Sequence, residues 1–136
     1  QLVPAPHMIF AVYLGDDNDA GSTLAPITQV VRPADTIISI SSANPVTVSS
    51  QPNMFTLSLA VVPPGAPIVP ATGTITVFDT FEGVTTALVT LSIGQSGMSP
   101  ALTAVGTHVI TAVYSGDNDY NGSTSAPITQ VIIAPS

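Results

Sequence analysis

Apolar and polar residues alternate along much of this chain, which is the pattern of β-strands that bury one face. The segment 55–61 is the clearest example, because every second residue is large and apolar and the residues between them are threonine, serine and alanine. No segment has helical periodicity. The alternating segments lie at 38–41, 55–61, 74–77, 87–93, 105–114 and 124–133. The apolar positions predicted to form the core are Phe55, Leu57, Leu59, Ile75, Val77, Val89, Leu91, Ile110 and Ala112.

Turn-forming residues separate these segments at the spacing of an all-β sandwich. They are Pro63-Pro64-Gly65, Gly83, Gly94, Gly97 and the turn between Gly116 and Gly122. About seven short strands in roughly one hundred residues predict two packed antiparallel sheets. The predicted fold class is therefore all-β.

One segment occurs twice. Residues 7–31 return as residues 108–132 without a gap, and sixteen of the twenty-five aligned residues are identical. The offset of 101 residues is the length of one sandwich domain, so both segments are predicted to be the last β-hairpin of such a domain, with strands at 8–14 and 23–31 in the first copy. The predicted organisation is a hairpin of a preceding repeat at 1–31, a linker at 32–35, a complete domain at 36–133 and the start of the next linker at 134–136.

Composition excludes several classes of protein. Only 7% of the residues are charged, the formal net charge is −7, and the single basic residue is Arg32. A phosphate backbone or an anionic membrane surface therefore finds almost no cation to bind, which argues against nucleic-acid partners. No apolar run reaches transmembrane length, so membrane insertion is not expected. The chain has no cysteine, which leaves no disulfide framework.

Three segments resemble the bacterial immunoglobulin-like repeats (Big, group 3 type). They are Ala-Asp-Thr at 34–36, Gly-Thr-Ile-Thr-Val-Phe-Asp at 73–79, and Val-Gly-Thr-His-Val-Ile-Thr-Ala-Val-Tyr-Ser-Gly-Asp at 105–117. The resemblance covers 34–133 in order. It implies an immunoglobulin-like antiparallel β-sandwich of about seven strands, strung in tandem on secreted or cell-surface proteins. Repeats of this kind usually act as spacers and adhesion stalks.

Catalysis finds no support in the sequence. His7 and His108 occupy the same repeat position, where a structural histidine that bonds the backbone at the start of a strand is the favoured interpretation. Asp79 and Glu82 are the two carboxylates that lie close together outside the turns, and neither is expected to have a histidine or lysine to pair with. Serine and threonine are abundant but lack an activating base. We therefore expect no enzyme.

The acidic turn is the candidate metal site. Asp117, Asp119 and Asn121 reproduce the opening D-x-D-x-N-G of a calcium loop, in which alternating oxygen ligands surround a hard cation. The terminal glutamate is missing, because Ile128 stands at the twelfth position. A plain hairpin turn is the alternative, since aspartate, asparagine and glycine are also what long turns contain. Tyr120 is expected to pack on the domain and not to serve as a sugar-stacking platform. No other cofactor is expected.

Three functions from different classes fit these observations. The first is a structural module of an extracellular surface protein, fibre or adhesin stalk, joined to neighbouring copies of the same repeat. The second is a filament subunit whose N-terminal hairpin docks into a neighbour's sandwich, because the hairpin lacks a sheet of its own to cover it. The third is an adhesion module that depends on calcium or binds a host or surface glycan. The residues predicted to mediate assembly are Ile9, Ala11, Tyr13 and Ile27.

Overall fold

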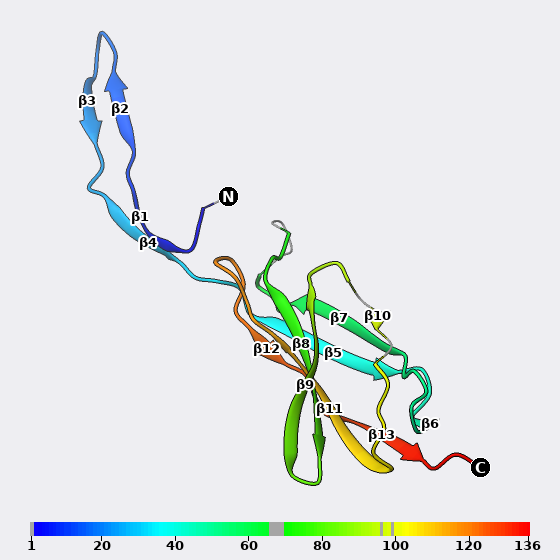
Figure 1. Ribbon diagram of the computed structural model, residues 1–136. Coiled ribbons are helices and arrows are strands. Elements are labelled where there is room, and N and C mark those ends of the chain that lie inside the picture. Colours follow the sequence, from blue (N-terminus) through cyan, green and yellow to red (C-terminus); the bar gives the residue numbers. More distant parts are fainter. Residues whose placement is uncertain (1, 66–69, 96, 99) are drawn as a thin grey trace. The chain divides into compact units, whose positions relative to one another are not determined.

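The computed structural model describes residues 2–65, 70–95, 97–98 and 100–136, and the regular structure in these ranges is all β-strand (Figure 1). The chain divides into two compact units, Gln1–Pro33 and Ala34–Ser136. Within the described ranges, no helix is long and apolar enough to cross a membrane.

The first unit is a hairpin built from two short antiparallel sheets. Its strands are β1 (Ala5–Ile9) paired with β4 (Ile27–Val31), and β2 (Val12–Gly15) paired with β3 (Ala20–Thr23). The prediction of two unbroken strands at 8–14 and 23–31 is therefore wrong in detail. The break falls opposite Pro26, which has no backbone N–H to donate to a partner strand. Between the two short sheets, the arms of the hairpin are joined by a hydrogen bond from Leu24 N to Ala11 O, which is 2.9 Å long.

The second unit contains two sheets. One has the strand order β10-β7-β5, and the other has the order β6-β13-β11-β8-β9, with β12 paired to β11. The described strands are β5 (Thr36–Ser42), β6 (Val46–Val48), β7 (Phe55–Val61), β8 (Thr74–Phe81), β9 (Val84–Ser92), β10 (Gly97–Met98), β11 (Gly106–Tyr114), β12 (Ser123–Thr124) and β13 (Ile128–Ile133). The short strands β6, β10 and β12 bring the number above the seven that were predicted.

One strand pair departs from the predicted antiparallel pattern. The short strand β6 runs parallel to β13, with Val46 opposite Val131. The chain passes from the first sheet to the edge of the second between Ser42 and Val46, and Val131 N donates to Pro45 O at 2.8 Å. Three residues are too few for an alternation to be recognised, so the sequence held no signal for this strand.

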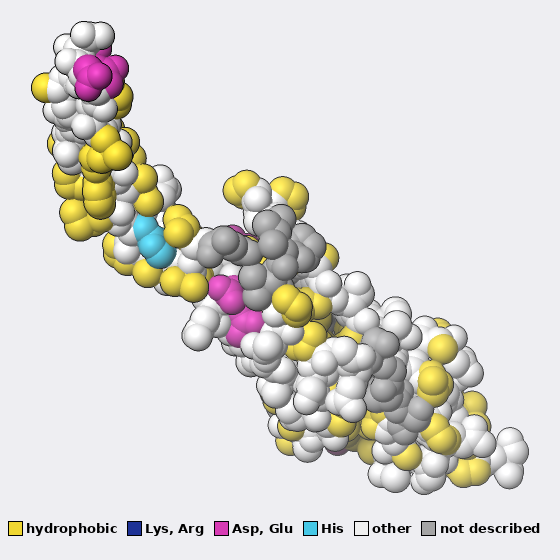
Figure 2. All heavy atoms as spheres, turned by 90° about the horizontal axis from the view of Figure 1, so that it is seen from above, with side chains coloured by type: hydrophobic (Ala, Val, Ile, Leu, Met, Phe, Trp, Pro, Cys, Tyr) yellow, Lys and Arg dark blue, Asp and Glu magenta, His cyan; other side chains and the backbone are white. Residues whose placement is uncertain are grey.

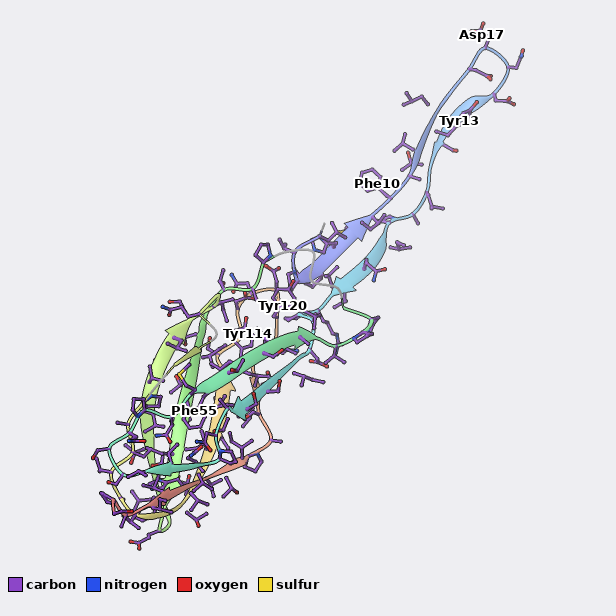
Figure 3. The ribbon with its side chains drawn as sticks, turned by 90° about the vertical axis from the view of Figure 1, so that its right-hand side faces the viewer. Phe10, Tyr13, Asp17, Phe55, Tyr114 and Tyr120 are labelled. Carbon is purple, nitrogen blue, oxygen red and sulfur yellow. The ribbon has the colours of Figure 1, made fainter. Side chains whose placement is uncertain are left out.

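The core lies between the two sheets, as the alternation predicts. Its buried apolar residues are Ile38, Ile40, Phe55, Leu57, Ile75, Val77, Leu102, Ile110, Ala112, Tyr114, Tyr120 and Ile132. Three residues of the predicted core, Leu59, Val89 and Leu91, are partly buried and pack against this cluster. The Phe55, Tyr114 and Tyr120 side chains lie within the unit (Figure 3).

A β-bulge changes the predicted faces of β9. Val77 pairs with Val89, but the next residue, Phe78, pairs with Ala87, so Leu88 is the extra residue. Leu88 and Val89 both pack against the core, whereas Ala87 is exposed. Alternation over 87–93 groups Ala87 with Val89 and Leu91 on the inner face, but Ala87 lies on the outer face because the bulge reverses the faces of the residues before it.

Truncation of Leu57 to alanine should lower the free energy of unfolding by about 2–5 kcal/mol, because the side chain is buried between the sheets and its loss leaves a cavity. The control is Ile37→Ala on the neighbouring strand, where the side chain is 59% exposed and the expected change is within about 0.5 kcal/mol. Urea denaturation followed by circular dichroism measures both. Equal effects of the two substitutions would contradict the assigned faces.

Candidate functional site

His108 lies at the start of β11 and is almost completely buried. Its Nδ1 atom is 2.9 and 2.8 Å from the two carboxylate oxygens of Asp79, and its Nε2 atom is 2.8 Å from Ala104 O. The Phe81 ring stacks on the imidazole with 4.4 Å between ring centroids. The bond to Ala104 O is the backbone contact that the sequence predicted for a structural histidine at this position.

Pairing of Asp79 with His108 corrects a prediction, since no histidine was expected near this carboxylate. Strands β8 and β11 are neighbours, and Asp79 lies opposite Ile110, two residues from His108. A signal was present in the sequence. Asp79 continues the inward-facing positions of Ile75 and Val77, and a carboxylate on a core-facing position requires a partner.

The hydrogen bonds of His108 engage both nitrogens of its ring. Nε2 donates to Ala104 O, because a carbonyl oxygen can only accept, and Nδ1 shares a hydrogen bond with the carboxyl group of Asp79. A hollow of about 270 Å³ opens beside the pair and includes Thr86 and Thr103 in its lining. Both ring nitrogens of His108 are bonded to groups of their own domain, which is the arrangement of a structural histidine.

The acidic turn of the second unit is held by the carboxylate of Asp117. Its Oδ1 atom accepts the backbone N–H groups of Asp119 and Tyr120, at 2.8 and 2.9 Å. Its Oδ2 atom accepts the N–H and the hydroxyl of Thr72, at 2.7 and 3.1 Å. Partial burial acts to raise the pKa of Asp117, but these donors together hold that pKa below its ordinary value.

Tyr114 joins the same cluster from the end of β11. Its hydroxyl donates to Thr72 O at 2.8 Å. Burial of the phenol raises the pKa of Tyr114 to about 12, and the negative charge of Asp117 adds to this effect. Tyr120 is buried in the core, which confirms that it packs on the domain and is no platform for a sugar ring.

The turn of the first unit has the same geometry. Asp16 Oδ1 accepts the backbone N–H groups of Asn18 and Asp19, which lower the pKa of Asp16. Asp16 N donates to Asp19 O in one turn, and Asp117 N donates to Tyr120 O in the other, both at the 101-residue offset.

The glycine that precedes each acidic turn is required by the backbone. Gly15 and Gly116 have φ values of +84° and +76°, and a Cβ atom at either would lie within 2.6 Å of the backbone nitrogen of Gly21 or Gly122. The repeated sequence therefore folds into a repeated structure.

The three predicted calcium ligands form hydrogen bonds at this turn, Asp117 and Asn121 through their side chains and Asp119 through its backbone. Asp117 is engaged by four donors, as described, and Asp119 accepts the N–H of Ala34 through its backbone oxygen at 2.9 Å. Asn121 donates its side-chain amide to Asp35 Oδ1 at 2.7 Å. In the described ranges, no three His, Cys, Asp or Glu residues form a group that could hold a metal ion. A turn motif accounts for these residues, and calcium binding stays a prediction.

The contacts of Ala34 and Asp35 place these two residues, expected in a linker, in the second unit. Val62 N donates to Asp35 O at 2.8 Å, and Asn121 N donates to Ala34 O at the same distance.

The four predicted assembly residues are exposed in the first unit. Ile9 is 43% exposed and Tyr13 is 49% exposed, whereas their counterparts Ile110 and Tyr114 in the second unit are 0% and 1% exposed. Tyr13 projects from the hairpin, and Asp17 marks its tip (Figure 3). Hydrophobic side chains spread over much of the hairpin surface (Figure 2). Ala11 and Ile27 are exposed as well.

Removal of the buried carboxyl group by Asp79→Ala should lower the free energy of unfolding of the second unit by about 3 kcal/mol, because it leaves the buried Nδ1 atom of His108 without its partner. Glu82→Ala, in the exposed turn that follows β8, is the control and should change stability by less than about 0.5 kcal/mol. The double variant Asp79→Ala with His108→Gln should cost less than the sum of its single variants. Additive costs, measured by urea denaturation, would contradict a coupled pair.

The turn carboxylate should make the second unit sensitive to acid. Because the pKa of Asp117 is lower in the folded state, its stabilisation is complete above the ordinary aspartate pKa of about 3.9 and is lost as the pH falls through the lower folded value. Asp117→Asn should therefore lower stability at pH 7 and flatten the loss of stability between about pH 5 and pH 2. Thermal unfolding across this range measures the slope, and identical slopes for both proteins would disprove the role of Asp117.

Comparison with known proteins gives one family. Residues 39–133 match the profile of the bacterial Ig-like domain (group 3). No curated protein matches the chain. The matched range includes most of β5 and all of β6 to β13, so it covers both sheets, the His108 pair and the acidic turn. The chain therefore belongs to the bacterial Ig-like domain (group 3) family.

Proposed function

We propose that this protein is a structural module of an extracellular surface protein, fibre or adhesin stalk, joined end to end with modules of the same type. The observation that carries the proposal is the second copy of the last hairpin. Residues 7–31 repeat residues 108–132 in sequence, in strand register and in turn hydrogen bonds. A chain that contains one whole sandwich and the last hairpin of another is what a tandem array of such domains would contain.

Family membership supports the extracellular location, because domains of this family usually occur in surface or extracellular proteins. The chemistry of the described residues supports a structural role. The buried His108, the turn carboxylate of Asp117 and the hydroxyl of Tyr114 all bond to groups of their own domain.

Labelling of intact producing cells tests the location. An antibody against the second unit should bind intact cells, and protease added outside the cells should remove the signal. A control antibody against a cytoplasmic protein should bind after lysis alone. A signal that appears only after lysis would overturn the proposal.

Calcium titration tests the structural role against a calcium-dependent adhesive role. We expect no saturable heat on addition of CaCl₂ and an unchanged melting temperature in excess chelator, because the Asp117 carboxylate is already engaged by four donors. Asp117→Asn is the matched control. Saturable binding that raises the melting temperature, and that Asp117→Asn abolishes, would favour the adhesive role and contradict a purely structural module.

A further inference from the structure

One face of the first hairpin is exposed, whereas the equivalent face in the second unit is buried. We call this exposed face the inner face. This inner face consists of Ile9, Ala11, Tyr13 and Ile27, together with the polar residues His7 and Gln29. Each has an identical counterpart at the 101-residue offset. In the second unit, the opposite sheet and strand β8 cover those counterparts, so the groups that would bind the inner face can be named.

His7 has half of the bonds that His108 makes. Its Nε2 atom is 2.7 Å from Val3 O, which reproduces the bond from His108 Nε2 to Ala104 O. No partner for its Nδ1 atom is found among the described residues of the first unit. In the second unit this nitrogen binds Asp79, which β8 supplies. By the repeat correspondence, the group that would complete the bonds of His7 is a carboxylate on a strand that pairs with β1.

Gln29 gives a second and independent indication. Its counterpart Gln130 is fully buried, accepts the Ser42 hydroxyl at 2.7 Å, and donates to Asn44 O at 2.9 Å and Thr47 Oγ1 at 3.2 Å. Gln29 is exposed and has one weak contact, 3.5 Å long, to the backbone oxygen of Val30. In the second unit, the groups that bind this glutamine come from the segment that runs from the end of β5 into β6. Gln29 has the same side chain but lacks such a segment in the described part of the first unit.

We propose that the inner face binds the strands equivalent to β5 through β8 of another repeat, located earlier in the same polypeptide. This inference rests on the proposed function, because it takes the chain to be part of a tandem array. The bound segment carries a carboxylate opposite Ile9, where it meets His7, and hydroxyl and carbonyl groups that meet Gln29. Its apolar residues cover Ile9, Ala11, Tyr13 and Ile27.

Two of the nine differences between the copies argue against a second copy of this chain as the occupant. Asp19 stands where Tyr120 is buried in the core, and Leu24 stands where Ser125 is buried with its hydroxyl accepting Ala112 N. If residues 7–31 replaced residues 108–132 in a neighbour's sandwich, the exchange would bury a carboxylate and crowd a leucine into a serine site.

The test is to supply the missing strands. A copy of residues 34–101 is joined to Gln1 of the full chain, which places the appended aspartate the same 29 residues before His7 as Asp79 lies before His108. In this fusion, Asp19→Tyr and Leu24→Ser match the hairpin to the appended strands. Amide hydrogen exchange of residues 7–31 should slow by about 100-fold relative to the chain without the appended copy. Residues 108–132 report in the same sample that the second unit is folded.

Two variants of the fusion distinguish specific docking of the hairpin from nonspecific hydrophobic association. Asp79→Ala made in the appended copy alone should restore most of the fast exchange, because it removes the partner of His7. The fusion that keeps Asp19 and Leu24 should be protected at least about 10-fold less than the matched one. Equal protection of residues 7–31 in the matched fusion and in the fusion that keeps Asp19 and Leu24 would overturn the argument against a second copy of this chain as the occupant.

Three further results would overturn the proposal. One is unchanged exchange of residues 7–31 in the matched fusion while residues 108–132 stay protected. Another is insensitivity of that exchange to the appended aspartate. The third is association of the unfused chain, seen by sedimentation, that protects residues 7–31, since a second copy would then be the occupant. Surface labelling of cells is independent of all three, so failure of the docking and failure of the extracellular function are distinguishable.

Discussion

Coverage of one hairpin by the opposite sheet is the constraint on which the second unit depends. Strand β11 lies inside its sheet between β8 and β13, and its inward residues Ile110 and Ala112 are fully buried. The apolar residues of β5 and β7 face them across the core. An isolated two-stranded hairpin is marginal in water, so most of the stability of this segment comes from that burial. The chain contains this hairpin twice, once covered by the opposite sheet in the second unit and once exposed in the first unit.

Buried polar groups add specificity to this packing. The Asp79 and His108 pair bonds β8 to β11, and Gln130 bonds β13 to the segment between β5 and β6. Each group would cost free energy if it were buried without its partner, so a register shift of either strand is penalised. The Asp117 turn adds a third constraint, because it connects β11 and β12 to Thr72 just before β8.

Much of this arrangement could be predicted from the sequence, and the exceptions have physical causes. Strict alternation located β5, β7, β8 and β11 and their buried residues, and the gap-free repeat predicted two hairpins. Alternation carries no information on pairing between distant strands, so the Asp79 and His108 contact was missed although both residues lie on inward positions. The bulge at Leu88 and the parallel strand β6 were missed because each depends on a partner strand. The acidic turn resembled a calcium loop because turn capping and cation binding use the same residue types.

One pair of hydrogen bonds tests the account most directly. Leu24 N donates to Ala11 O at 2.9 Å in the open hairpin, and Ser125 N donates to Ala112 O at 2.8 Å in the covered one. The bonds are equivalent in length and position and differ in their surroundings. In the unmodified chain, amide hydrogen exchange at Ser125 should be slower than at Leu24 by a factor of about 1,000. Equal exchange rates would contradict the claim that coverage by the opposite sheet, and not the hairpin itself, provides the stability.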